Sequence, residues 1–146
     1  RKGGTIDAAL GRHATQRARM AGPQGGRGKE AITHWRLIES YGADRNGKPV
    51  ASLVACRLET GRTHQIRVHM AHIGCPVVGD PVYATGFRTK EKLLPEKARA
   101  AVAALGRQAL HAAVLAFPHP LTGEEMRFET PAPADFRKAA KAFTAL

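Results

Sequence analysis

The sequence is poor in cysteine, in aromatic residues and in long apolar runs. Its 146 residues include two cysteines, Cys56 and Cys75, and no Cys-x-x-Cys pair, which predicts a reduced cytoplasmic protein without a zinc motif. Aromatic residues make up only 5%, so a surface that stacks successive single-stranded bases is not expected. No apolar run approaches the roughly 20 residues of a membrane span, so a membrane partner is not expected. The first residues contain neither a methionine nor an apolar signal core, which we interpret as a fragment of a protein that is not secreted.

Acidic residues are also scarce. Asp and Glu number 12 against 23 Lys and Arg, which gives a net charge of +11, and the sequence pI is near 10.5. Such an excess predicts attraction to a polyanion such as RNA, with phosphate contacts dominating the affinity. The alternative is a basic soluble protein without a nucleic-acid partner. Residues 1–30 carry seven basic and two acidic residues; we expect a basic, loop-rich arm there, either an RNA contact or a flexible linker.

Hydrophobic periodicity predicts an α+β fold, a mainly antiparallel mixed sheet with flanking helices. Residues 31–39 and 50–58 predict an antiparallel hairpin around Asn46-Gly47. Residues 63–73 predict a helix with a buried stripe of Ile66, Met70 and Ile73 that ends at Gly74. Further strands are expected at 77–83, 109–117 and 126–130, and further helices at 96–105 and 133–146. We interpret residues 1–146 as part of one domain, with the sheet and helices in 31–146.

The segment between the second strand and this helix is the first candidate site. Thr60-Gly61-Arg62-Thr63 lies at an expected helix start, where unpaired N–H groups favour an anion. Arg67, one turn further, falls at the edge of the buried stripe. A buried arginine needs a carboxylate, best in a bidentate pair, and only Glu59 is acidic within the segment, so a partner from elsewhere in the fold is implied. The alternative, which the periodicity alone favours, is a surface arginine whose stem lies along the helix.

Three histidines, His64, His69 and His72, lie on the same expected helix. The spacing of His69 and His72 could hold a metal, but no carboxylate or cysteine completes a motif. Histidines that are exposed or hydrogen-bonded are therefore the preferred interpretation, and His111 and His119 show no ligand pattern either. We expect no metal site.

Three blocks of residues, spread along the sequence, form a characteristic pattern. The first block comprises Leu58, Thr60-Gly61-Arg62-Thr63-His64-Gln65-Ile66-Arg67-Val68-His69, His72, Gly74, Pro76, Gly79-Asp80 and Tyr83. The second comprises Arg107, Leu110-His111-Ala112, Leu115, Phe117 and His119-Pro120. A weaker third comprises Ile6, Arg12-His13, Met20, Gly28-Lys29, Ala31 and Thr33. In order and spacing, these blocks resemble the RluA/RluD family of pseudouridine synthases. The resemblance covers nearly the whole chain and implies the C-terminal portion of the synthase catalytic-domain fold.

The resemblance also implies a function and site residues. It implies isomerisation of uridine to pseudouridine in RNA, foremost large-subunit ribosomal RNA, by a monomer without cofactor or metal. The target base would be flipped into a pocket, and an aspartate would act as a covalent nucleophile. Arg67 matches the arginine that pairs with this aspartate, and Leu110, with Leu115 as the next candidate, would line the uracil pocket. The expected substrate or RNA contacts are Thr60, Gly61, Arg62, Thr63, His64 and Gln65.

One part of the family pattern is missing. The nucleophile of the family stands in a His-Arg-Leu-Asp stretch, and none of Asp7, Asp44, Asp80 and Asp135 has that setting. We therefore expect the nucleophile to lie upstream of Arg1 and the 146 residues to be inactive alone. Asp80 is interpreted as a turn residue. The alternative is a non-catalytic RNA-binding module that retains the synthase scaffold; a metal-dependent hydrolase that uses the helical histidines is a third.

Overall fold

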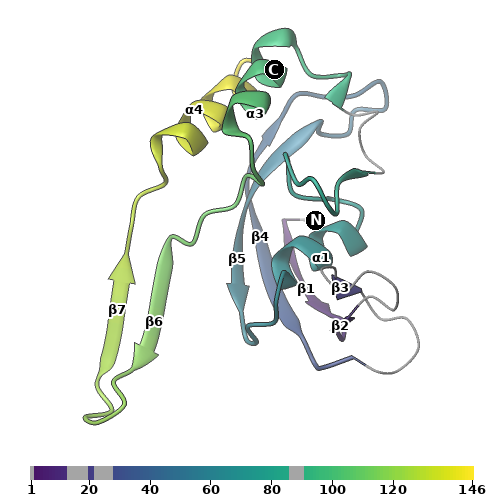
Figure 1. The fold of residues 1–146 in the computed structure, drawn as a ribbon. Coiled ribbons are helices and arrows are strands. Elements are labelled where there is room, and N and C mark those ends of the chain that lie inside the picture. The colour runs from purple at the N-terminus through teal and green to yellow at the C-terminus, as the bar shows by residue number, and fades with distance from the viewer. Residues whose placement is uncertain (1, 13–19, 22–27, 86–90) are drawn as a thin grey trace.

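The computed structural model describes residues 2–12, 20–21, 28–85 and 91–146. This part of the chain forms three antiparallel sheets and three helices (Figure 1). The strands are β1 (Gly3–Asp7), β2 (Gly11–Arg12), β3 (Met20–Ala21), β4 (Ile32–Tyr41), β5 (Ala51–Leu58), β6 (Val114–Pro118) and β7 (Glu125–Glu129), and the helices are α1 (Gln65–His72), α3 (Glu96–Leu105) and α4 (Ala134–Phe143). The predicted α+β class is confirmed. None of the helices in the described ranges is both long and apolar enough to cross a membrane.

A three-stranded sheet in the order β1–β4–β5 supports the candidate site. The predicted hairpin of β4 and β5 is confirmed, with Trp35 opposite Cys56. β1 pairs with the other edge of β4, so the expectation of an irregular arm is wrong for residues 3–7. Ile6 and Leu10 are 5% and 1% exposed, but their apolar pattern is too short to predict a strand from periodicity. Residues 13–19 and 22–27 of the expected arm lie outside the described part of the chain.

Helix α1 covers one face of this sheet. Met70 of α1 packs with Ile6 and Ala8, and half-buried Trp35 and Val54 adjoin them. The predicted stripe on this helix is only partly correct. Of its members Met70 is buried, Ile66 is half-buried and Ile73 is 38% exposed. The other buried residues of α1 are Gln65, Arg67, Val68 and His69, because hydrogen bonds allow polar side chains to occupy the inward face.

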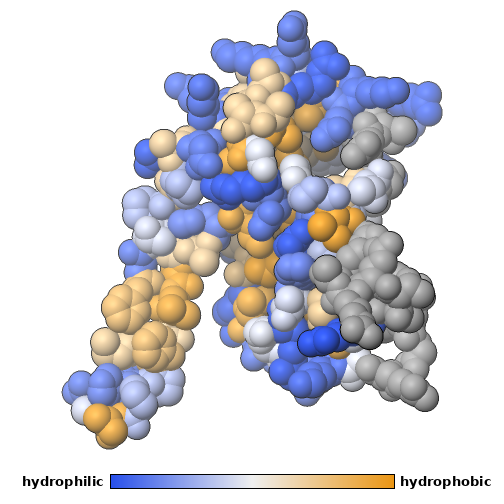
Figure 2. All heavy atoms as spheres, viewed as in Figure 1, coloured by the Kyte–Doolittle hydropathy of each residue, from blue (hydrophilic) through white to orange (hydrophobic). Residues whose placement is uncertain are grey.

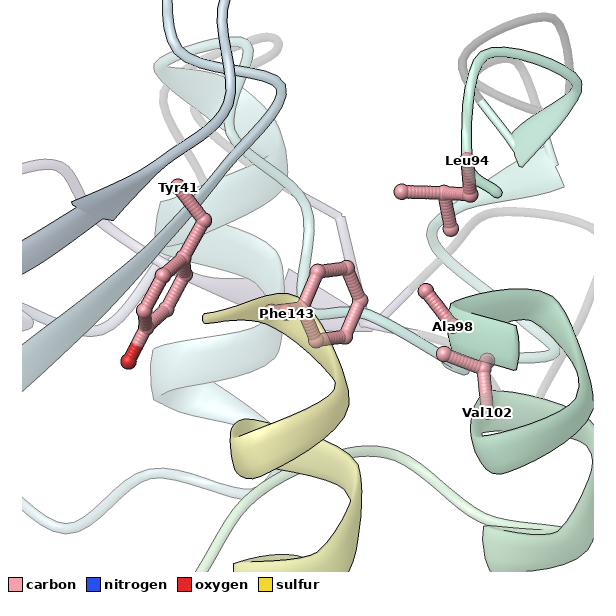
Figure 3. Close-up of a cluster of buried hydrophobic side chains, with 5 residues drawn as sticks. All are labelled: Tyr41, Leu94, Ala98, Val102 and Phe143. Atoms are coloured by element: carbon pink, nitrogen blue, oxygen red, sulfur yellow. The ribbon is translucent and has the colours of Figure 1, made fainter. Parts of the chain in front are cut away.

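A second apolar cluster lies at the other end of β4 and β5. Figure 3 shows its five side chains, which come from the end of β4, from α3 and its preceding turn, and from α4. They are Tyr41, Leu94, Ala98, Val102 and Phe143. The rings of Tyr41 and Phe143 lie 6.0 Å apart between centroids. The cluster joins the last helix to the sheet.

The hairpin of β6 and β7 extends away from the rest of the fold (Figure 1). Its apolar side chains are exposed, including Leu115 at 60% and Phe128 at 50%, and Figure 2 shows hydrophobic residues along the visible face of this hairpin. The rings of Phe117 and Phe128 stack at 5.9 Å. The first strand begins at Val114 rather than at the predicted residue 109, and residues 77–83 form turns rather than the expected strand.

Candidate active site

Gln65 ties the turn before α1 to strand β4. Its Nε2 donates to Ile32 O and Thr33 Oγ1, each at 3.0 Å. Its Oε1 accepts from Thr60 Oγ1 at 2.8 Å and from the Arg62 N–H at 3.0 Å. These bonds use all the donors and acceptors of the amide, and Gln65 is 2% exposed. The Gln65 side chain therefore holds the turn in place, and its amide has no unused donor or acceptor for the RNA contact expected from the sequence.

His69 fixes the same helix from a second point. The residue is 0% exposed, with Nε2 2.8 Å from Ala8 O and Nδ1 2.9 Å from Thr33 Oγ1. A carbonyl oxygen can only accept, so Nε2 carries the proton, and Nδ1 accepts from the hydroxyl when every group is satisfied. The hydrogen-bonded interpretation of His69 is confirmed. No group of three or more His, Cys, Asp or Glu side chains in the described ranges is arranged to hold a metal ion.

Arg67 forms a buried bidentate ion pair with Asp80. Its Nε donates to Oδ2 at 2.7 Å, and its Nη2 donates to Oδ1 at 2.9 Å. The side chains are 11% and 0% exposed, so the alternative of a surface arginine is wrong. The carboxylate that Arg67 requires is present within the chain, although the sequence resemblance assigned it to an aspartate upstream of Arg1. Fork geometry of this kind is the strongest form of the Arg–carboxylate interaction.

The Gly79–Asp80 turn aims the carboxylate at Arg67. Oδ1 of Asp80 also accepts from the N–H groups of Val82 at 2.9 Å and Tyr83 at 3.0 Å, which confirms Asp80 as a turn residue. Gly79 has φ +73°, and a Cβ there would lie 2.5 Å from Arg107 O. Only glycine combines this conformation with so close a neighbour.

The charges of the pair are mutually stabilised. Burial acts to raise the pKa of Asp80, but hydrogen bonds from Arg67, Tyr83 and Val82 outweigh it, and the pKa lies below its ordinary value. The hydrogen bond to Asp80 raises the pKa of Arg67 despite burial. Both groups are therefore ionised at neutral pH.

Tyr83 and His64 complete the surroundings of the guanidinium. Arg67 Cζ lies 4.9 Å from the centroid of the Tyr83 ring, a cation–π distance. The Tyr83 hydroxyl accepts from the Met20 N–H at 2.9 Å and lies 2.9 Å from His64 Nδ1. His64 has φ 56°, in the left-handed region. Burial and then the charge of Arg67 lower the pKa of His64, against the opposing effect of Asp80, so the ring is neutral and can accept from the hydroxyl.

The other expected site residues divide by position. Thr60 is half-buried and bonds to Gln65, whereas Gly61, Arg62 and Thr63 are exposed beside it. Leu110 follows a segment that runs alongside the Asp80 turn, because the Ala109 N–H donates to Val78 O at 2.8 Å and Arg107 O approaches Gly79. Leu115 instead lies on the extended hairpin, 60% exposed. The structure thus brings Leu110, and not Leu115, next to the turn that holds Arg67.

Sequence reasoning missed the contributions of Asp80 and Tyr83 to this arrangement. A signal was available, because both stand in the Gly79-Asp80-x-x-Tyr83 segment of the first block. The pairing itself could not be predicted, since a turn aspartate and an ion-paired aspartate have the same sequence pattern.

Comparison with known proteins identifies the family. A family profile described as RNA pseudouridylate synthase matches residues 1–72. The ribosomal large subunit pseudouridine synthase D of Pseudomonas aeruginosa is 47% identical over 137 residues, which cover 92% of this chain and 39% of the relative. The chain belongs to the RNA pseudouridylate synthase family. Its relative of the same name in Haemophilus influenzae is 46% identical over 145 residues, covering 99% of this chain and 41% of the relative.

A solved structure agrees with this membership. The human RNA pseudouridylate synthase domain containing 1 matches this chain with a TM-score of 0.64 and 31% identity, over 91% of this chain and 49% of that one. The chain spans about two fifths of the length of the curated relatives it matches. The residues matched by the family profile include Arg67 and the turn before α1.

Proposed function

We propose that the protein carrying this chain isomerises uridine to pseudouridine in RNA, with large-subunit ribosomal RNA as its substrate. The observation that supports this most is the 47% identity over 137 residues to a ribosomal large subunit pseudouridine synthase. The net charge of +11 suits a polyanionic substrate. Cytoplasmic location and a monomeric state remain predictions from the sequence.

In this proposal the nucleophile is an aspartate outside the described residues. Asp80 is a poor candidate, because its side chain is 0% exposed and its oxygens accept hydrogen bonds from Arg67, Val82 and Tyr83. A carboxylate so engaged cannot reach a flipped base. Arg67 would pair with the incoming aspartate and, by its charge, keep it ionised and nucleophilic. The uracil would then be detached, rotated and rejoined through carbon, with Leu110 against the base.

Replacement of the arginine tests this role. In the full-length protein, Arg67→Met should reduce pseudouridine formation by at least about a hundredfold, the order lost when a preorganised charged group is removed. RNA affinity should change little, because phosphate contacts dominate binding. Arg127→Met is the matched control, since Arg127 is exposed on the β6–β7 hairpin and pairs with Glu129 there. Chemical mapping of pseudouridine in ribosomal RNA and a filter-binding assay give the two readouts.

The outcomes separate the proposal from its alternative. If Arg67→Met forms pseudouridine at the wild-type rate, the assigned role of Arg67 is wrong. Full-length protein that binds RNA but forms no pseudouridine would favour the non-catalytic RNA-binding module. The 146 residues alone should form none, and activity from them would contradict the assignment of the nucleophile to a segment upstream.

A further inference from the structure

Within the described part of the chain, hydrogen bonds hold the guanidinium of Arg67 along one edge. Asp80 takes up Nε and Nη2, and no hydrogen bond to Nη1 is present among residues 2–12, 20–21, 28–85 and 91–146. The planar guanidinium has five N–H donors in a fixed fork. Once one edge is bound, the direction of the remaining donors is set by the position of Asp80.

Tyr83 supports the flat face of the same group. The Arg67 carbon Cζ lies 4.9 Å from the centroid of its ring. Tyr83 is itself held at two points: its hydroxyl bonds to the Met20 N–H and to His64, and its backbone N–H donates to Asp80 Oδ1. Asp80 therefore holds both the guanidinium and the backbone of the residue that packs against it.

We propose that Asp80 and Tyr83 are positioning residues, which fix the guanidinium of Arg67 so that its Nη1 side faces the reacting carboxylate. This inference rests on the proposed function. Neither residue would touch the substrate; both would act through Arg67. Fixing a charged donor before the reaction removes the cost of orienting it in the transition state, and a displacement of about 1 Å can cost on the order of a hundredfold in rate.

The variant Asp80→Asn should disrupt the ion pair with Arg67 while leaving the turn intact. An asparagine Oδ1 can still accept from Val82 and Tyr83, which preserves the turn. Its side-chain NH2 would instead face the Nε–H of Arg67, donor against donor, and the fork would open. Asp135→Asn is the matched control, because Asp135 also bonds an arginine, Arg107, but with its side chain 45% exposed.

The experiment measures the single-turnover rate of pseudouridine formation and the RNA dissociation constant in full-length protein. We expect Asp80→Asn to slow turnover by roughly tenfold to a hundredfold, with the RNA dissociation constant within about twofold of wild type, since few phosphate contacts are lost. Asp135→Asn should match wild type in both. Tyr83→Leu, which leaves the ion pair and removes the ring, should slow turnover by about threefold to tenfold, consistent with the modest energy of a cation–π contact.

Each outcome decides between a positioning role and a merely structural one. Asp80→Asn that turns over at the wild-type rate overturns the inference, and so does a loss of rate matched by an equal loss of RNA affinity, because unfolding of the turn would give that result. If Asp80→Asn fails to fold, an unchanged rate in Tyr83→Leu overturns it. A wild-type protein that forms no pseudouridine overturns the proposed function, and the inference with it. An active wild-type protein with an equally active Asp80→Asn variant overturns the inference alone, so the two failures are distinguishable.

Discussion

At the scale of single residues, the site consists of polar side chains that are buried and satisfied. Thr33, Gln65, Arg67, His69 and Asp80 are each at most 9% exposed, and no buried side-chain N or O atom in the described ranges lacks a partner. Their partners lie between 2 and 61 residues away along the chain, and each of the five has at least one partner 13 or more residues away. A burial pattern of this kind is costly unless every bond is made, so it specifies one arrangement of α1 on the sheet.

The Arg67–Asp80 pair should make stability depend on acid pH. Because the folded pKa of Asp80 lies below its ordinary value, the pair contributes fully above about pH 4, the unfolded value, and its contribution is lost as pH falls through the folded pKa. Asp80→Asn should lower the free energy of unfolding at pH 7 by roughly 3 kcal/mol, because it leaves Arg67 without a counter-charge. Urea unfolding should show that the wild type is more stable than Asp80→Asn by this amount at pH 7 and pH 5, and by a smaller amount at pH 3. An advantage that is constant to pH 3 would contradict the ion pair as its source.

At the scale of elements, the sequence predicted those helices and strands whose formation depends on residues close together in the chain. The hairpin of β4 and β5 followed from alternation and Asn46-Gly47, and α3 followed from an alanine-rich run that ends at Gly106. The inward face of α1 was misjudged because hydrophobicity cannot detect distant hydrogen-bond partners for Gln65 and His69. For the same reason, the sequence indicated that a buried Arg67 needs a carboxylate partner but did not show which residue provides it. β1 was missed since its pairing with β4 is long-range.

The turn that carries Asp80 should require glycine before it. Gly79→Ala would place a Cβ 2.5 Å from Arg107 O at φ +73°, adding a collision to backbone strain. Gly47→Ala is the control, because Gly47 has φ +71° with nothing within 4 Å of its Cβ position. We expect a loss of about 1 kcal/mol for Gly47→Ala, and at least about twice that for Gly79→Ala, by urea unfolding. Equal losses would mean that residue 107 moves aside easily and that the close approach is not a constraint.

At the scale of the whole molecule, apolar burial is unevenly distributed. Phe143 is 6% exposed in the cluster that joins α4 to the sheet, whereas Phe117 is 41% exposed on the extended hairpin. Phe143→Ala should therefore lower the free energy of unfolding by about 3–5 kcal/mol. Phe117→Ala should lower it by about 1 kcal/mol, the value of an exposed aromatic pair. Thermal unfolding of the two variants tests this. A loss of stability in Phe117→Ala as large as that in Phe143→Ala would show that the hairpin is covered in solution.

The charge of the molecule should govern its affinity for RNA. With a net charge of +11, binding should release counterions, and the logarithm of the affinity should fall linearly with the logarithm of salt concentration, with a slope near −0.7 for each single-stranded phosphate contacted. Arg62 lies exposed at the turn before α1 and uses Nε to bond Glu30 O at 3.0 Å, so we expect its two terminal nitrogens to contact a phosphate. Arg62→Gln should flatten the slope by about 0.7. Lys48→Gln should leave the slope unchanged, because Lys48 lies in the β4–β5 turn at the opposite end of the sheet. A slope near zero for the wild type would mean that the basic surface does not contact phosphates, and equal effects of the two variants would mean that the turn before α1 is not a preferred contact.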